Sequence, residues 1–422
     1  MQRRVTGLTA AVAALSMAAL LAGCGESGGS GDVTLKLVAA DYGDSAANSS
    51  KKYWDKLAEK FEDEHPGIKV DVTVYSWTDV DRKVKEMVAD GEAPDLAQIG
   101  AYADYAAQDK LYSADDVLSI PTQADFLAPL SKAGVVNRVQ YGMPFAASTR
   151  LLFFNEKLFK SAGITPPESW SELQAAAKKL KSRGVKIPYA LPLGPEEAQA
   201  ETYQWLLSGG GGYTDNVGSY DFDSKQNVDT FNWLKNELVG KGLTGPTPPG
   251  KLNRAEAFAA FTRGEVGMLN GHPTLMQMAA KKHLKYGMVP MPGVNGKAQS
   301  TMGVADWMMA FKENGNRKEI REFLDFAYSK KNVLDFSREY DLLPVTTSAS
   351  QEMADDKADA KKLGGFLEEL PGSQLYPVGK TSWAQVSVQI KKYIGKTVDP
   401  NGDPEATLAQ LDAKAAAEEN AS

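Results

Sequence analysis

Residues 141–155 read YGMPFAASTRLLFFN, and this stretch decides how the chain is organised. Its apolar residues form a run typical of a strand buried inside a sheet, but three polar residues interrupt it. Side chains alternate along a strand, so Ser148 and Arg150 share one face and Thr149 takes the other. Burying an arginine without a partner is costly. The strand therefore either ends in a polar turn between two strands or passes beside a wet cleft.

The bulk composition excludes several classes of protein. With 422 residues the chain is long enough for two or three domains, and 43% hydrophobic and 24% charged residues are ordinary for a globular protein. The net charge of −7 gives no electrostatic footprint for nucleic acid. A single cysteine rules out a disulfide framework and a Cys/His zinc cluster. We expect a monomer with no cofactor, no metal and no nucleic-acid partner.

The N-terminus carries an export signal. Arg3-Arg4 precedes a short apolar run that ends in Leu21-Ala22-Gly23-Cys24, as in a signal peptide covering residues 1–24. These last four residues resemble a bacterial lipobox, which implies that Cys24 is diacylated and becomes the mature N-terminus. The alternative is a chance cysteine. Whether export uses the general or the twin-arginine route stays open.

We expect the segment after the signal, residues 25–31, to be a flexible tether, because its sequence GESGGSG is rich in glycine and serine. It satisfies the G-x-S-x-G pattern of serine hydrolases, but that pattern needs a strand before it and a helix after it. We therefore reject a hydrolase site there.

Strands and helices alternate in the first hundred mature residues. Residues 33–38, 68–75 and 95–99 have the alternation of strands, and helical spacing lies between them at 53–61 and 80–89. This order predicts an α/β layer with a mainly parallel sheet. Later, Ser169 and Glu172 are spaced as a capping box for a helix, and Asp403 with Pro404 begins another.

Several motifs then resemble one family. They are FEDEHPGIKVDV, ADGEAPDLAQIG, the pattern N-E-K-L-F-x-x-A-G-I-x-x-P-x-x-W-x-E-L at 155–173, and matches at 259–268 and 343–345. Together they resemble the bacterial extracellular solute-binding proteins of family 1, the maltose-binding-protein type, over essentially the whole mature chain.

The resemblance implies an α/β class II periplasmic-binding-protein fold. Each of its two lobes has a mixed, mainly parallel sheet flanked by helices, and the chain crosses between the lobes at a hinge. By alignment the N-terminal lobe is 32–146 and 305–346, and the C-terminal lobe is 147–304 and 347–422.

The implied function is capture of a carbohydrate, a mono- or oligosaccharide, and its delivery to the permease subunits of an ABC importer. The protein would be held at the extracellular face of the cell membrane by the lipid on Cys24. One alternative is a receptor for a polyamine, a phosphodiester or a metal-chelate. Another is an exported glycosidase using Asp41, Asp104 and Asp306, which the resemblance disfavours because its members are not enzymes.

Sugars need polar partners for their hydroxyls and aromatic platforms for their C–H faces, and open α/β sheets bind ligands at strand ends. Candidates of both kinds at such ends are Asp41, Tyr42, Trp77, Tyr102, Asp104, Ser148, Arg150, His272, Asp306, Trp307, Tyr340 and Trp383. The resemblance adds Gln199 and Glu201.

Several of these candidates could instead have a purely structural role. Trp77, Trp307 and Trp383 could be core aromatics, and His272 could be a turn residue. Trp54, Trp170 and Trp205 are assigned to the core. The aromatic expected after Asn270-Gly271 is replaced by His272-Pro273-Thr274, which puts a long maltodextrin in doubt.

Overall fold

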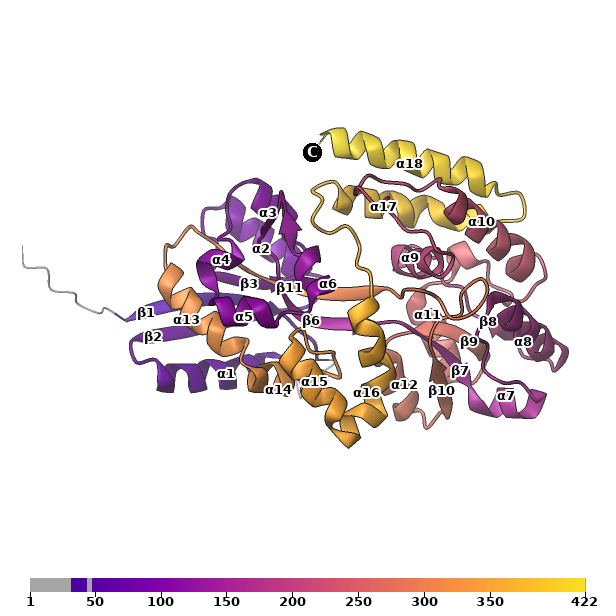
Figure 1. Ribbon diagram of the computed structural model, residues 1–422, viewed down its shortest axis with the longest axis horizontal. Helices are drawn as coiled ribbons and strands as arrows, with labels where there is room; N and C mark the ends of the chain where they lie inside the picture. The colour runs from indigo at the N-terminus through magenta and orange to yellow at the C-terminus, as the bar shows by residue number, and fades with distance from the viewer. Residues whose placement is uncertain (1–31, 44–47, 422) are drawn as a thin grey trace, which may run out of the picture.

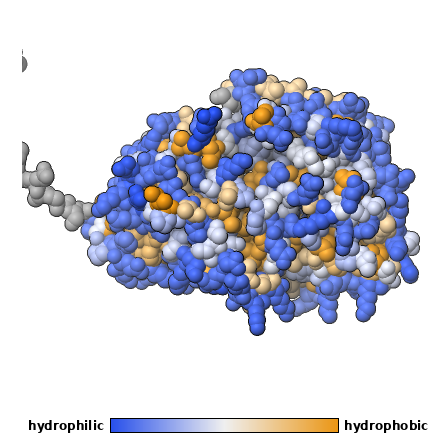
Figure 2. All heavy atoms as spheres, viewed as in Figure 1, coloured by the Kyte–Doolittle hydropathy of each residue, from blue (hydrophilic) through white to orange (hydrophobic). Residues whose placement is uncertain are grey.

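The computed structural model describes residues 32–43 and 48–421. Figure 1 shows two lobes, each a sheet with helices around it, joined by strands that run through the middle of the molecule. The surface in Figure 2 is mostly hydrophilic, with hydrophobic residues in small scattered groups. Within the described ranges, no helix combines the length and the apolar character needed to cross a membrane.

The first lobe is built on a five-stranded sheet in the order β2-β1-β3-β11-β6. Its strands are β1 (Val33–Ala40), β2 (Ile68–Tyr75), β3 (Leu96–Ile99), β6 (Met143–Thr149) and β11 (Gly303–Ala310). Its helices are α1 (Lys51–Glu64), α2 (Val80–Ala89), α3 (Ala103–Ala107), α4 (Ala114–Val117), α5 (Ile120–Asp125), α6 (Ala128–Ala133), α13 (Arg317–Ala327) and α14 (Lys330–Tyr340). A small hairpin pairs β4 (Val135–Val136) with β5 (Val139–Gln140).

The second lobe has a four-stranded sheet in the order β10-β7-β9-β8. Its strands are β7 (Leu151–Asn155), β8 (Ile187–Tyr189), β9 (Val266–Gly271) and β10 (Tyr286–Val289). Its helices are α7 (Glu156–Ala162), α8 (Trp170–Ser182), α9 (Ala198–Ser208), α10 (Lys225–Trp233), η1 (Leu234–Val239), η2 (Pro249–Lys251), α11 (Arg254–Thr262), α12 (Pro273–Lys281), α17 (Trp383–Tyr393), η4 (Ile394–Val398) and α18 (Pro404–Ala421).

In each sheet, one strand runs against all the others. β11 is antiparallel to both of its neighbours in the first sheet, and β7 is antiparallel to both of its neighbours in the second. Each of these strands brings the chain in from the other lobe, so it starts at the edge where the remaining strands end. The carboxyl ends of those remaining strands therefore meet between the lobes, which is where open α/β sheets bind ligands. The expectation of mixed sheets flanked by helices is confirmed, with all strands but one in each sheet running in the same direction.

Local signals placed several of these helices correctly. Ser169 caps α8 by accepting a hydrogen bond from the backbone of Glu172, but the Glu172 carboxylate accepts from the backbone of Glu168 instead of Ser169. The expected capping box is thus only half formed. Trp54 and Trp205 are fully buried, as expected, and Trp170 nearly so.

Sequence reasoning gave no account of α15 (Thr347–Asp355), α16 (Lys357–Glu369) and η3 (Leu370–Gly372). Figure 1 shows α16 between the two lobes. Phe366 on α16 packs against Phe153 of β7 at a ring distance of 6.2 Å. This segment forms a third passage of the chain between the lobes.

We call residues 146–150 and 301–306 the ribbon, because here β6 and β11 pair as they pass between the lobes. The Thr149 hydroxyl donates to the Phe366 carbonyl at 3.0 Å, and the Thr301 hydroxyl lies 2.9 Å from the Arg150 carbonyl. The backbone of Gly303 donates to Gln374, and Gln374 donates to Thr301. All three passages are thereby tied together at one place.

The Gly303→Ala variant tests how tightly these passages pack. A Cβ at Gly303 would lie 2.5 Å from the Ser373 hydroxyl oxygen and 3.0 Å from its Cβ. We expect a loss of about 1–3 kcal/mol in the free energy of unfolding, measured by urea denaturation, because overpacking forces the passages apart.

Gly372→Ala is the matched control, since a Cβ there meets nothing within 4 Å among the described residues. Adding Ser373→Gly to Gly303→Ala should recover part of the loss. Equal stability of Gly303→Ala and Gly372→Ala would contradict this account of the packing.

Candidate functional site

One face of the ribbon is open to solvent and the other is buried. Along β11, Val304 and Asp306 are partly exposed, whereas Gly303, Ala305 and Trp307 are buried. On the paired strand Ser148 is partly exposed and Thr149 is buried. This is the alternation that the sequence predicts, and it places Ser148, Val304 and Asp306 on one side, with Arg150 continuing the series. The interrupted strand therefore carries a partly exposed polar face within a continuous sheet and is not a surface turn.

Asp306 stands at the first-lobe end of this open face. The Tyr42 hydroxyl donates to its carboxylate at 2.7 Å, and the Gln98 amide donates to that hydroxyl at 2.8 Å. Burial raises the pKa of Asp306 to about 7, although the hydrogen bond from Tyr42 favours the charged form. Asp306 is therefore able to act as a hydrogen-bond donor or an acceptor near neutral pH.

Aromatic side chains surround this acid. The ring of Tyr42 lies 5.3 Å from Trp77 and 5.8 Å from Tyr340. Trp77 is 37% exposed, whereas Tyr340 is nearly buried. Trp77 thus offers a partly exposed ring beside Tyr42, which in turn holds Asp306, and the structure brings these four predicted site residues into one group.

Arg150 stands at the second-lobe end, about 13 Å along the strand from the position that pairs with Asp306. It is buried, and its guanidinium donates to Glu197 at 3.0 Å. Glu197 also contacts Arg254, which forms a second ion pair with Glu196 at 2.8 Å. Arg150 therefore has the partner that its burial requires.

Glu201 and His272 lie beside Arg150. Glu201 is buried and accepts hydrogen bonds from Trp205 at 2.9 Å and Asn270 at 2.9 Å, and burial raises its pKa to about 7. Burial, followed by the charges of Arg150 and Arg254, holds the pKa of His272 well below its usual range. His272 thus presents a neutral imidazole near Arg150. It also precedes α12 as the turn residue that the alternative interpretation expected, without a capping hydrogen bond from its side chain.

A second aromatic group borders this end. Trp383 stacks on Tyr376 at 5.1 Å and lies 5.4 Å from Tyr213. The Tyr203 hydroxyl donates to the Leu375 carbonyl at 2.9 Å, which fixes the segment that carries Tyr376. Trp383 is half-buried in this group, so it is a partly exposed aromatic of the second lobe.

Two predicted residues are placed elsewhere. Trp307 and Tyr102 are buried in the core of the first lobe, with ring centroids 5.1 Å apart. This corrects their predicted position in the cleft. Trp307 follows Asp306 on β11 and therefore faces the opposite, packed side. Tyr102 precedes α3, and its hydroxyl donates to the Ala133 carbonyl inside the first lobe.

Other predicted residues have local roles. The Asp41 carboxylate accepts from the backbones of Gly43 and Ser50 and from the Ser49 hydroxyl, so it closes its own loop. Gln199 is half-buried, and its side-chain oxygen has no partner in the described part of the chain.

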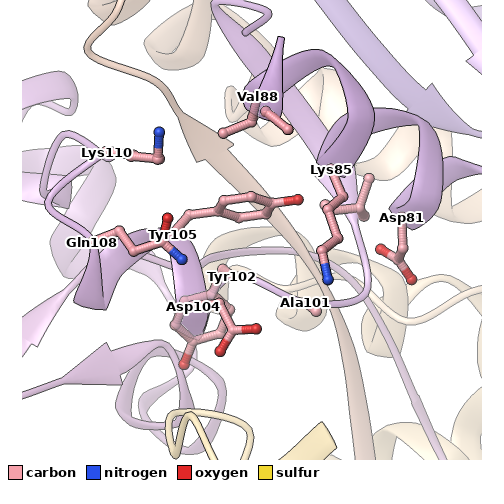
Figure 3. Close-up of a pocket in the computed structure, with 11 residues that line it drawn as sticks. Asp81, Lys85, Val88, Ala101, Tyr102, Asp104, Tyr105, Gln108 and Lys110 are labelled. Carbon is pink, nitrogen blue, oxygen red and sulfur yellow. The ribbon is translucent and has the colours of Figure 1, made fainter. Parts of the chain in front are cut away.

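Asp104 is exposed and lines a separate pocket of about 300 Å³ between α2 and α3. Figure 3 shows Tyr105 crossing this pocket with its hydroxyl toward Lys85 and Asp81. The residues lining it all come from 81–110 of the first lobe, so the structure does not bring Asp104 to the ribbon.

Sequence reasoning missed Glu197, Arg254 and Tyr376. Nothing in the local sequence pattern shows that the two charged residues flank Arg150. Tyr376 lies in an irregular segment with no periodicity. Its position beside Trp383 depends on the third passage of the chain between the lobes, which directly precedes it.

The family pattern described as bacterial extracellular solute-binding protein matches residues 46–334 of this chain. The chain is 28% identical over 375 residues to a binding protein of Brucella abortus, covering 86% of this chain and 89% of that protein. It is 23% identical over 353 residues to the sn-glycerol-3-phosphate-binding periplasmic protein UgpB of Pectobacterium atrosepticum, covering 76% and 74%.

Two solved structures show the same fold. The cyclic α-maltosyl-1,6-maltose binding protein of Arthrobacter globiformis matches with a TM-score of 0.79 and 17% identity, covering 93% of this chain and 100% of that chain. The GacH receptor of Streptomyces glaucescens, solved unliganded and with acarbose, matches with a TM-score of 0.76 and 19% identity, covering 92% and 99%.

The chain therefore belongs to the bacterial extracellular solute-binding proteins, with the two-lobed fold of periplasmic binding proteins. Proteins of this class are the binding components of ABC transporters and are not enzymes.

The raised pKa of Asp306 predicts a pH-dependent stability. Between its ordinary pKa of 3.8 and about 7, the folded chain keeps a proton on Asp306 that the unfolded chain releases. The folded state binds more protons, so this contribution to stability is present below pH 4 and is lost as pH rises toward 7. Relative to Asp306→Asn, we expect the wild type to lose on the order of 1–3 kcal/mol between pH 4 and pH 8.

Urea denaturation of both proteins across this range measures the difference. Glu201 titrates in both proteins, so its contribution cancels. A difference that stays constant with pH would show that Asp306 has an ordinary pKa.

Proposed function

We propose that this protein captures a carbohydrate, a mono- or oligosaccharide, on the open face of the ribbon and delivers it to the permease subunits of an ABC importer. This proposal rests on the way polar and aromatic side chains are arranged along the ribbon. Ser148, Arg150 and Asp306 supply polar groups along one face, an exposed aromatic stands at its first-lobe end, and Tyr376 with Trp383 stands at the other. A polyhydroxylated ring needs both kinds of partner.

The charges favour a neutral solute. Arg150 and Arg254 are both ion-paired, with Glu197 and Glu196, so their positive charge is already compensated. An anion would need basic groups free to bind it. The names of the structural relatives agree with this, since those two proteins bind a cyclic maltosyl sugar and acarbose.

A second candidate is a phosphate-bearing polyol. The sequence relatives named UgpB bind sn-glycerol 3-phosphate, and two arginines lie within one pocket here. This candidate requires Glu197 to leave Arg150 when the ligand arrives.

The lobe boundaries and the anchor belong to the same proposal. The solute would be sequestered when the N-terminal lobe, residues 32–146 and 305–346, closes on the C-terminal lobe, residues 147–304 and 347–422. The ribbon would act as the hinge.

Cys24 lies outside the described residues, and the lipobox supports its diacylation. Two acyl chains hold a protein at a membrane stably, whereas one chain holds it only marginally. The protein would act as a monomer at the extracellular face.

Thermal melting of the chain from Asp32 to Ser422 tests the ligand class. The panel is glucose, galactose, mannose, fructose, maltose, trehalose, glycerol 3-phosphate and spermidine. A bound solute must raise the melting temperature in a saturable way. We expect at least one sugar to do so, and Tyr376→Ala to weaken its binding about tenfold or more, because truncating an aromatic anchor removes its contact area.

Tyr393→Ala is the matched control, since this half-buried ring lies among lysines at the end of α17. It should leave sugar binding unchanged. A shift with glycerol 3-phosphate alone would favour the second candidate, and a shift with spermidine alone would overturn both.

Cys24→Ser tests the anchor in a bacterial host that processes lipoproteins. The wild-type protein should partition into the detergent phase of Triton X-114, and the variant into the aqueous phase, because the serine cannot carry a thioether-linked lipid. Equal partitioning of the two proteins would refute lipid anchoring.

A further inference from the structure

A small recess lies in the second lobe next to Arg150. Its rim is formed by Glu197, Arg254 and His272, which are partly exposed, and its wall includes Ala200 and Phe258. The floor carries Glu201, Gln204 and Asn270, all of which are more than nine-tenths buried. The recess measures about 20 Å³, which is room for a single oxygen-bearing group.

Two floor residues have buried polar atoms without a partner among the described residues. These are the side-chain nitrogen of Gln204 and the side-chain oxygen of Asn270. A buried polar atom left unpaired costs about 1–3 kcal/mol, so such atoms normally have a partner. Both atoms belong to residues that line the recess, so a polar group that enters it is a candidate partner for them.

The orientation of both amides is set by their other contacts. The Gln204 oxygen accepts from the backbone of Met302 at 3.0 Å, so its NH₂ group is the part left over. The Asn270 nitrogen donates to Glu201 at 2.9 Å, so its oxygen is the part left over. The floor therefore offers one donor and one acceptor.

A hydroxyl group is the ligand group that matches this pair. It accepts one hydrogen bond and donates another, and it fits the available volume. A carboxylate has no proton to give to Asn270, and an ammonium has no lone pair to accept from Gln204. A methyl group would leave both floor atoms unpaired.

We propose that this recess binds one hydroxyl group of the captured solute, with Gln204 donating to it and Asn270 accepting from it. This assignment rests on the proposed function and makes these two residues determinants of specificity. It predicts that the site distinguishes a sugar sharply from the deoxy analogue that lacks the hydroxyl at this one position. A site built to pair with a hydroxyl rejects such an analogue far more strongly than a hydrophobic pocket rejects a missing methylene.

The experiment is calorimetric titration of the chain from Asp32 to Ser422 with deoxy sugars. The probes are the sugars of the melting panel that raise the melting temperature, beginning with glucose and galactose. Each is compared with its 2-, 3-, 4- and 6-deoxy derivatives. In the wild type we expect one derivative of the set to bind about a hundredfold or more weakly than its parent.

Two variants locate this discrimination. Gln204→Glu keeps the side-chain oxygen that accepts a hydrogen bond from the backbone of Met302, and it replaces the NH₂ donor with a second oxygen. Ala200→Val keeps every polar group and fills the recess. In either variant, the affinity ratio between the parent sugar and that one derivative should fall most of the way to one. The affinity ratios between the parent sugar and the other three derivatives should stay as in the wild type.

Gln385→Glu is the control, because it makes the same chemical change on the exposed face of α17. It should behave like the wild type. If Gln204→Glu fails to fold, as judged by its melting curve, Ala200→Val decides the question alone.

The outcomes separate the two claims. If no sugar raises the melting temperature, the proposed function fails and this assignment fails with it. If a sugar binds but both variants discriminate its deoxy derivatives as the wild type does, the carbohydrate function stands. In that case the recess does not contact the solute and the assignment is overturned.

Discussion

Side chains along the paired strands of the ribbon alternate between two faces, and this alternation decides both how the lobes are joined and which groups lie between them. Because neighbours on a strand face opposite sides, one face of the ribbon can be packed while the other stays open. Thr149 and Trp307 take the packed side, where the hydroxyl of Thr149 holds the third passage of the chain. Ser148 and Asp306 take the open side. The same two strands thus join the lobes and supply the floor between them.

The open side carries charges that the protein must neutralise locally. At one end Asp306 is supported by Tyr42 and Gln98, and burial brings its pKa near neutrality. At the other end Arg150 is paired with Glu197, within a series of alternating charges that continues to Arg254. Both solutions leave hydrogen-bonding groups in place without an exposed net charge. Such a floor suits a neutral solute with many hydroxyl groups.

Much of the fold was predictable from local pattern, because strands such as β2 and helices such as α2 follow their periodicity closely. The opposite faces of Ser148 and Thr149 also followed from alternation alone. The position of Trp307 was wrong in the sequence-based interpretation, since the same alternation that exposes Asp306 must bury its neighbour. Tyr376 and Gln204 could not be found from sequence. Their roles depend on α16 and α9 packing against the ribbon, which local residues do not encode.

A solute that binds on the open face of the ribbon should draw the two lobes together. Distance measurement between two spin labels tests it directly, in a chain that begins at Asp32 and so lacks Cys24. The labels are placed on cysteines introduced by Thr78→Cys and Ala255→Cys, two exposed positions beside the aromatic group of the first lobe and beside Arg254. Saturation with a sugar that raises the melting temperature should shift the distances to shorter values. An unchanged distance distribution at saturation would contradict the claim.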